Sequence, residues 1–224
     1  MEESEVRDLV SRTETIEAVE SAFRDKGEET AQMPPKSYVY FDRFNGDFRV
    51  MPAYLPGMGA AGVKVVNVHP DNPDDRGLPT VMATILLLDP ETGRPLCIMG
   101  GTRVTDLRTG AAGAVAAKHL AREDSKSVGF IGTGAQAKTQ LSALLEVFDL
   151  ASCRAYGRSV ESRETFAEDM ADRVDEFEIV ETPREAVSNA DILVTVTPSR
   201  EPVVKKEWVS PGTHVNAIGA DAEA

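Results

Sequence analysis

A glycine-rich turn near the middle of the chain constrains its fold more than any other feature. An apolar stretch at residues 127–131 leads directly into this turn, and a segment with helical character begins at once after it. The residues of the turn are Gly132, Thr133, Gly134, Ala135, Gln136 and Ala137. In a strand, turn and helix of this kind, the first glycine permits a tight bend and the second lets the backbone approach a pyrophosphate.

The small residue at position 137 strengthens this interpretation, because it lets the helix pack closely on the strand. The N–H groups at the start of the helix are then available to phosphate oxygens. Glycine turns also precede many ordinary helices, so a plain strand-to-helix turn is the alternative. The surrounding strand and helix favour a dinucleotide-binding site at residues 132–137.

Short strands and helical segments alternate in the second half of the chain. Strands are expected at residues 128–131, 153–156, 178–180, 192–196 and 214–218. This alternation predicts an α/β fold with a Rossmann-type doubly wound parallel sheet. A full dinucleotide-binding fold has six strands, so the five strands found before Ala224 predict an incomplete sheet whose last strand is missing.

The first half of the chain has a different pattern. A helical segment at residues 4–23 precedes strand candidates at 38–41, 48–51, 61–68, 81–88 and 95–99. Asn45-Gly46, between the first two of these strands, is typical of a hairpin. An alanine-rich helix then runs over about 104–120. We therefore expect an N-terminal α+β domain at residues 1–118 and a dinucleotide-binding domain at residues 119–224.

The charge of the chain bears on its partners and its environment. With 37 acidic and 24 basic residues, the formal charge is −13. Nucleic acid is therefore not an expected partner, because phosphate backbones need clustered lysine and arginine. Sixteen of the basic residues are arginines and only eight are lysines. This balance favours a highly saline cytoplasm, where salt screens self-repulsion, and ordinary solubilising charge is the alternative.

Composition gives no sign of a membrane, a disulfide or a metal. The longest apolar stretch, residues 81–88, is far too short to cross a bilayer, and the acidic first residues lack the features of a signal peptide. We expect a cytoplasmic protein with no membrane partner. Cys97 and Cys153 lie far apart in strand-like segments, so we expect no disulfide, and no metal-ligand spacing is present.

Several motifs in the same order resemble those of one known family. They are found at residues 32–36, 62–70, 78–83, 107–112, 132–137 and 215–221. Together they resemble the ornithine cyclodeaminase and mu-crystallin family, and its archaeal alanine dehydrogenases look closest. The resemblance covers essentially the whole chain and implies an NAD(P)-dependent oxidoreductase. It also implies a homodimer formed through the first domain, which would bind the substrate. Family members continue beyond Ala224, so the chain looks truncated.

The resemblance implies two catalytic residues, Lys64 and Asp221. Lys64 lies within an apolar strand, where partial desolvation lowers the pKa of a lysine and favours proton transfer, and a snorkelling or paired lysine is the alternative. Asp221 follows the last predicted strand at its carboxyl end, where it could position water, and a turn-capping aspartate is the alternative. The family continues with Pro-Gly-Lys after this acid, whereas this chain reads Ala-Glu-Ala.

Three cations are candidates to hold a substrate carboxylate. They are Lys36, Arg49 and Arg108, of which the arginines can form paired hydrogen bonds. Each alone could be a solvated surface cation. The cyclodeaminase branch of the family has a glutamate at the position of Arg49, so a basic residue there resembles the alanine dehydrogenase branch.

The end of the second strand of the nucleotide domain bears on the choice of cofactor. NAD sites commonly place an acid there to bind the ribose 2′-hydroxyl. This chain has Gly157, where the archaeal relatives carry that acid, followed by Arg158 and Ser159. These two residues could hold a 2′-phosphate, which favours NADP over NAD, and an exposed loop is the alternative. Thr197, after the fourth strand of the nucleotide domain, is expected beside the nicotinamide half of the cofactor.

The expected substrate is a small amino acid or keto acid. The first hypothesis is oxidative deamination of L-alanine to pyruvate and ammonium, or the reverse reaction. Ornithine cyclodeamination and ketimine reduction are the enzymatic alternatives, because they use the same fold and cofactor site. A non-catalytic NADP-binding protein like the crystallin members, or a truncated remnant, is a third hypothesis from another class.

Overall fold

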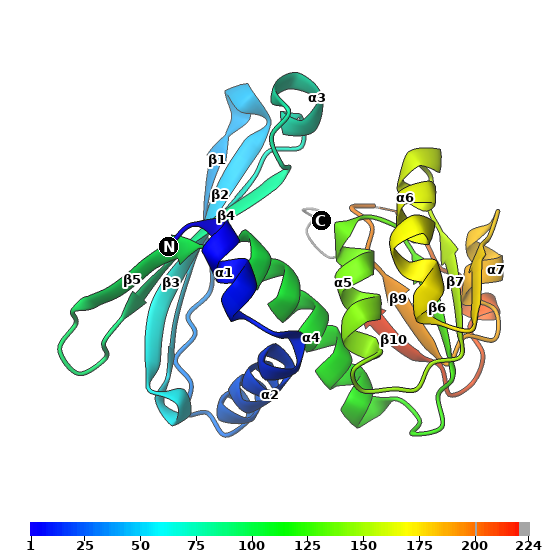
Figure 1. Ribbon diagram of the computed structural model, residues 1–224, viewed down its shortest axis with the longest axis horizontal. Helices are drawn as coiled ribbons and strands as arrows, with labels where there is room; N and C mark the ends of the chain where they lie inside the picture. The colour runs from blue at the N-terminus through cyan, green and yellow to red at the C-terminus, as the bar shows by residue number, and fades with distance from the viewer. Residues whose placement is uncertain (200, 220–224) are drawn as a thin grey trace. The chain divides into compact units, whose positions relative to one another are not determined.

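The computed structural model describes residues 1–199 and 201–219, which form two compact units, Met1–Arg108 and Thr109–Ala224. Each unit contains its own five-stranded sheet (Figure 1). The division falls within helix α4 (Thr102–Leu120), and the boundary predicted after residue 118 lies further along this helix.

The sheet of the first unit is antiparallel, and its strands follow one another in chain order. They are β1 (Ser37–Phe41), β2 (Gly46–Leu55), β3 (Ala60–Val68), β4 (Val81–Leu88) and β5 (Pro95–Gly100). Asn45 has a φ of 45° and closes the short helix η1 (Asp42–Phe44) between β1 and β2, so the predicted hairpin is present. Helix η2 (Pro56–Met58) joins β2 to β3, and helix α3 (Asn72–Arg76) lies between β3 and β4.

The two faces of this sheet differ, because successive side chains of a strand point to opposite sides. One face meets the start of α4: a Cβ added at Gly101 would lie about 3 Å from side-chain atoms of Ile85 and Ala83. Val66 and Ala83 on this face are buried. Helix α1 (Glu3–Leu9) lies on the same side, and α2 (Arg12–Gly27) crosses the end of the sheet near η2.

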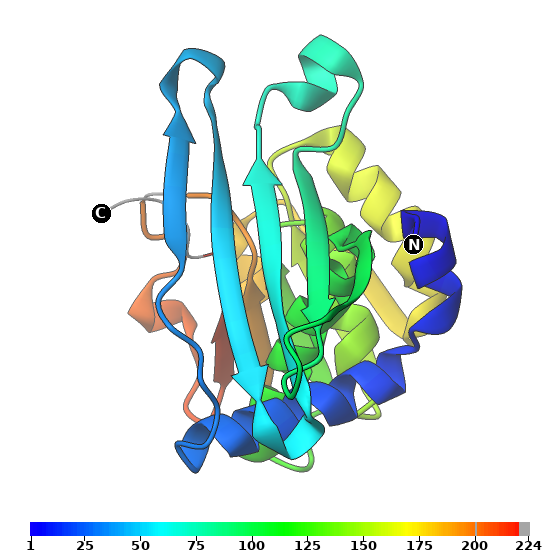
Figure 2. The same ribbon diagram turned by 90° about the vertical axis from the view of Figure 1, so that its left-hand side faces the viewer.

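The opposite face of the first sheet is not covered by any helix of its own unit among the described residues, as Figure 2 shows. Most of the side chains on this face are apolar. They include Val39, Phe41, Phe48, Val50, Tyr54, Val63, Val65, Met82, Leu86 and Ile98. Ile98 is 64% exposed. The sheet therefore has one helix-covered face and one open, apolar face.

The second unit contains a fully parallel sheet in the order β10-β9-β6-β7-β8. Its strands are β6 (Ser127–Ile131), β7 (Ser152–Tyr156), β8 (Glu176–Ile179), β9 (Ile192–Thr195) and β10 (His214–Ala217). The chain first builds outward from β6 to β8, then returns to the other side of β6. This order confirms the predicted Rossmann-type doubly wound sheet.

Helices pack around the parallel sheet and close its core. They are α5 (Ala135–Leu144), α6 (Val160–Met170), η3 (Ala171–Arg173), α7 (Pro183–Val187) and η4 (Lys206–Trp208). Phe130, Leu141 and Phe166 are completely buried in this core. Because both faces of the central strand β6 are covered, its residues are almost all buried, as is typical of parallel sheets.

Three further findings concern the chain as described in residues 1–199 and 201–219. No helix in these ranges is long and apolar enough to cross a membrane. They contain no group of three or more His, Cys, Asp or Glu side chains placed to hold a metal ion. Cys97 and Cys153 are both free thiols, and burial raises the pKa of Cys153 to about 12.

Candidate active site

The glycine turn has the geometry that a close approach of strands requires. Gly132 has a φ of 110°, a conformation that residues with a side chain rarely adopt. A Cβ at this position would also lie 2.8 Å from the carbonyl oxygen of Val196. The N–H of Gly132 donates a hydrogen bond to the carbonyl of Tyr156 at 2.8 Å. The turn therefore joins the carboxyl ends of β6, β7 and β9.

Helix α5 begins with an open N-terminus. Its N-cap residue is Gly134, which has no side chain to cap the first N–H groups, and a Cβ there would meet no atom within 4 Å. Gly134 and Ala135 are exposed and Gln136 is half-buried, whereas Ala137 is completely buried. Free N–H groups, open space and the helix dipole suit an anion, so these residues fit a pyrophosphate.

Thr197 lies at the same edge of the sheet, just after β9. It is half-buried, and a Cβ on Gly219 would collide with its carbonyl oxygen. The backbone segments that follow β9 and β10 therefore adjoin each other near the end of β6. In open α/β sheets, ligands bind at the carboxyl ends of the strands, where the strand order reverses.

The end of β7 contains the residues expected to contact the ribose of the cofactor. Gly157 is buried, and any side chain at this position would collide with Oγ1 of Thr133. That hydroxyl forms a 2.8 Å hydrogen bond with Oγ of Ser162. Ser159 is the N-cap of α6 and accepts a hydrogen bond from the N–H of Ser162 at 3.3 Å, while Arg158 is exposed.

In the first unit, Lys64 lies on the helix-covered face of β3. Its neighbours across the sheet are Met51 on β2 and Ile85 on β4, so apolar side chains flank it on both sides. Desolvation, and then the positive charges of Arg108 and Lys36, lower the pKa of Lys64 to about 8. The apolar strand thus produces the lowered pKa that the sequence predicts.

Arg108 and Lys36 reach this site from different elements. Arg108 lies on α4, and Lys36 immediately precedes β1. The surrounding protein lowers the pKa of Arg108 through desolvation, and Asp106 opposes this effect. An arginine stays protonated at all pH values of interest, so Arg108 is a permanent positive charge beside Lys64.

Arg49 lies on the same face of the sheet as Lys64. It pairs with Val66, two residues after Lys64 on β3, and side chains two apart share a face. Its Nε and an Nη donate to the two carboxylate oxygens of Asp47 at 3.0 and 3.2 Å. The two side chains are only 12% and 16% exposed, so much of the charge of Arg49 is compensated within the sheet.

Tyr38 brings two of the cations together. The ammonium of Lys36 lies 5.2 Å from the centre of its ring, and the guanidinium of Arg49 lies 5.3 Å from it. Cations at such distances are attracted to an aromatic ring. Sequence reasoning missed both Tyr38 and Asp47. Tyr38 lies two residues before Tyr40, and Asp47 lies two residues before Arg49, so each pair shares one face of its strand. This alternation is the signal that could have identified them.

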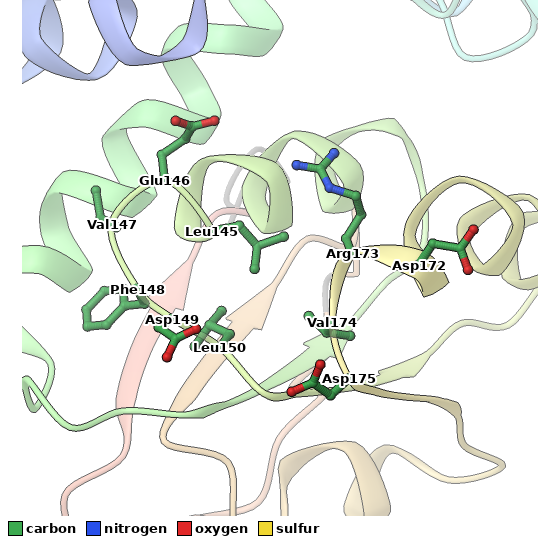
Figure 3. A pocket seen from close by; sticks show the side chains of 10 residues that line it. All are labelled: Leu145, Glu146, Val147, Phe148, Asp149, Leu150, Asp172, Arg173, Val174 and Asp175. Atoms are coloured by element: carbon green, nitrogen blue, oxygen red, sulfur yellow. The ribbon is translucent and has the colours of Figure 1, made fainter.

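A hollow of about 560 Å³ lies at the opposite edge of the parallel sheet. Residues 145–150 and 172–175 face each other across it, just before β7 and β8 (Figure 3). Four acidic side chains line it, and one of them, Asp149, forms an ion pair with Lys126 at 2.6 Å. Because ligands of such sheets bind at the carboxyl ends of the strands, this hollow is not the candidate active site.

The predicted site residues therefore form two groups, one in each unit. The first group contains Lys64, Lys36, Arg49 and Arg108, and the second contains residues 132–137 with Arg158, Ser159 and Thr197. Asp221 lies outside the described residues.

Comparison with known proteins agrees with this picture. A family model described as Ornithine cyclodeaminase/mu-crystallin family matches residues 1–224. The alanine dehydrogenase of Archaeoglobus fulgidus is 52% identical over 98% of this chain and 66% of its own length. This chain therefore spans just under two thirds of that relative.

Two solved structures share the fold over nearly the whole chain. One is an archaeal alanine dehydrogenase dimer with bound NAD, which is 52% identical with a TM-score of 0.92 and covers 99% of this chain and 67% of its own. The other is the Thermococcus litoralis Δ1-pyrroline-2-carboxylate reductase with NADH and L-proline. It is 43% identical, has a TM-score of 0.90 and covers 96% of this chain and 67% of its own. With the glycine turn and the sheet order, these matches show that the chain belongs to the ornithine cyclodeaminase/mu-crystallin family.

Proposed function

We propose that this protein is an NAD(P)-dependent oxidoreductase that acts on a small amino acid and the corresponding keto or imino acid. The observation that carries the proposal is the half-buried Lys64, whose pKa of about 8 results from an apolar strand and two neighbouring cations. A lysine with this pKa can accept or donate a proton near neutral pH. Perturbed pKa values of this kind are typical of functional sites.

The second unit would hold the cofactor. Its glycine turn and the open N-terminus of α5 fit a pyrophosphate, and the two related structures contain NAD or NADH. When bound, a nicotinamide cofactor accepts or donates the hydride. Thr197 would border the nicotinamide half, because it follows β9 at the carboxyl edge of the sheet.

The first unit would bind the substrate. Arg108 and Lys36 would hold its carboxylate, the arginine through paired hydrogen bonds and the lysine as a point charge. Arg49 would contribute less, because Asp47 already accepts two of its hydrogen bonds. Fixing the carboxylate orients the α-carbon and lowers the entropic part of the barrier.

Lys64 would move the proton at the substrate nitrogen or at the oxygen of the carbonyl group. Asp221 is proposed to position the water. With L-alanine, the proposed substrate, NAD(P)⁺ and water are consumed. The products are pyruvate, ammonium, NAD(P)H and one proton. In the reverse direction, Lys64 would donate the proton that it accepts here.

Reduction of a cyclic imine is the second candidate function. The 43% identical structure is a pyrroline-2-carboxylate reductase, and the same cations could hold the carboxylate of such an imine. Arg49 counts against ornithine as substrate, because a cation paired with Asp47 stands where the cyclodeaminase branch has a glutamate. Cofactor binding without turnover would instead favour a crystallin-like binding protein.

A homodimer is also proposed. The open face of the first sheet is apolar, and exposed apolar faces of this kind mark protein interfaces. The related archaeal structure is a dimer. Two copies would cover the apolar faces of their first units, and light scattering on the purified protein tests this.

Initial rates test the proposed reaction. Purified protein would be assayed with L-alanine, L-ornithine and L-proline, each with NAD and NADP, at low and at molar salt. We expect NAD(P)H formation that depends on L-alanine. Conversion of ornithine to proline without any alanine-dependent change in NAD(P)H would contradict the proposal.

A further inference from the structure

We infer that this protein prefers NADP(H) to NAD(H), with Arg158 and Ser159 as the residues that select the 2′-phosphate. This inference rests on the proposed function, and it goes beyond the related structures, which contain NAD or NADH. Three features at the carboxyl end of β7 support it: a closed position for an acid, a cation with no ion pair among the described residues, and an available hydroxyl.

The first feature is that position 157 has no room for a carboxylate. NAD-binding sites commonly use an acid at the end of the second strand to accept hydrogen bonds from the ribose. At this place the chain has Gly157, and even a Cβ would collide with the hydroxyl of Thr133. Thr133 is only 3% exposed and is held by its 2.8 Å hydrogen bond to Ser162. An acid at this position would need Thr133 to move.

The second feature is the charge that remains available. Among the described residues, Arg154 pairs with Glu178 at 3.6 Å and Arg163 pairs with Glu181 at 3.5 Å. Arg158 is exposed and forms no ion pair with any residue in the described part of the chain. A phosphate is the ligand that suits a guanidinium of this kind, because it accepts two parallel hydrogen bonds.

The third feature is the hydroxyl of Ser159. Its oxygen accepts the N–H of Ser162 and so caps α6. A hydroxyl also has one O–H to donate, and a phosphate oxygen can accept it. One charge opposes this arrangement: Glu161 is exposed in the first turn of α6 and would repel a phosphate.

Binding measurements test the inference without relying on turnover. Dissociation constants for NADPH and NADH would be measured by fluorescence titration at fixed ionic strength, together with 2′,5′-ADP and 5′-AMP. We expect the 2′-phosphorylated ligand of each pair to bind at least about tenfold more tightly. Arg158→Ala should remove most of this difference by weakening NADPH while leaving NADH unchanged.

Three further variants test the role of position 158 and of the residues around it. Arg173→Ala removes the same charge at the far end of α6, where η3 lies, and should change neither affinity. Glu161→Gln should strengthen NADPH binding and leave NADH binding unchanged. The double substitution Gly157→Asp with Thr133→Ala supplies both an acid and the space for it, and should reverse the preference toward NADH.

Three outcomes would overturn the inference. NADH binding at least as tightly as NADPH would contradict it and leave the proposed function intact, as would an equal loss of both affinities in Arg158→Ala. If neither cofactor binds, the proposed function itself is wrong, and the inference with it.

Discussion

The two sheets of this protein place their candidate functional groups in different ways. In the antiparallel sheet, Lys64 and Arg49 project from the middle of strands onto one face. In the parallel sheet, the candidate groups lie in the loops that follow β6, β7 and β9. The central strands of this parallel sheet are buried, so its candidate groups lie at the strand ends.

This difference has an energetic side. Lys64 is a positive charge held in a half-buried site beside two other cations, which disfavours the folded state. The glycine turn uses backbone N–H groups that would be free at any helix N-terminus, so it carries no comparable penalty. We therefore expect substitutions at the site of the first unit to lower activity and raise stability. Substitutions in the glycine turn should lower both activity and stability.

The largest effect is expected from Lys64→Met. If Lys64 is the general acid and base, kcat should fall about 10²- to 10⁴-fold, while cofactor affinity stays unchanged because the nucleotide site belongs to the other unit. Steady-state rates and cofactor titration measure the two quantities. Lys26→Met, an exposed lysine of the same unit, is the control and should leave kcat unchanged. A loss of less than tenfold would exclude Lys64 as the proton carrier.

The same variant should be more stable than the parent protein at pH 7. The folded state lowers the pKa of Lys64 from its ordinary value of 10.5 to about 8. Between these two pH values, the unfolded chain therefore carries more bound protons than the folded chain. The penalty is complete below pH 8 and disappears as the pH rises through this window. Thermal unfolding at pH 7 and pH 10 should show a gain that shrinks with pH. A variant that is less stable than the parent protein at both pH values would contradict the expected destabilising effect of Lys64.

Gly132→Ala should damage the second unit in both respects. Its φ of 110° and the 2.8 Å approach to the Val196 carbonyl make any side chain unfavourable. We expect a loss of stability of about 1–3 kcal/mol and a large loss of cofactor affinity. Denaturant unfolding and fluorescence titration measure these effects. Gly134→Ala, where a Cβ meets no atom, is the matched control and should cost less stability.

A smaller effect is expected from Arg108→Met on the pH profile. Deamination needs neutral Lys64, so kcat/KM should rise with pH up to about 8. Removing the charge of Arg108 raises the pKa of Lys64, and the rising limb should move to higher pH. Arg43→Met, which removes an exposed arginine of the same unit, should leave the limb in place. An unchanged limb in Arg108→Met would show that the two groups do not interact.

The smallest effect is expected from Lys126→Ala. Lys126 pairs with Asp149 at 2.6 Å and lowers the pKa of that carboxyl, yet the side chain of Asp149 is 98% exposed. Exposed ion pairs contribute little, because solvent screens them. The melting temperature should therefore stay the same at low and at high salt. A clear decrease would mean that surface pairs matter more in this acidic chain than their exposure implies.

The sequence predicts the second unit better than it predicts the candidate site in the first unit. A glycine turn between a strand and a helix has a local cause, so its position and the doubly wound order follow from neighbouring residues. The pairing of Arg49 with Asp47 depends on two side chains that share a strand face, and the aromatic link through Tyr38 depends on the pairing of β1 with β2. Strand register decides the contact through Tyr38, and composition alone does not specify register.

The burial of Gly157 shows a second limit of prediction from the sequence. The sequence shows a glycine where an acid is common, but only the fold shows that Thr133 fills the space from another loop. Similarly, the apolar run around Lys64 predicts a lowered pKa for this lysine. Lys36 and Arg108 lower the same pKa further, but they belong to segments that are distant from Lys64 in the sequence. Contacts of this range are invisible to local patterns.

The collision between position 157 and Thr133 also restricts how cofactor preference can evolve. An acid cannot arise first at position 157 without a steric cost, whereas a smaller residue at position 133 would open the space and remove only one hydroxyl contact. The order of the two changes therefore matters. A lineage of such proteins would be expected to lose the threonine before it gains the acid, so that the two positions vary together although they lie on different loops.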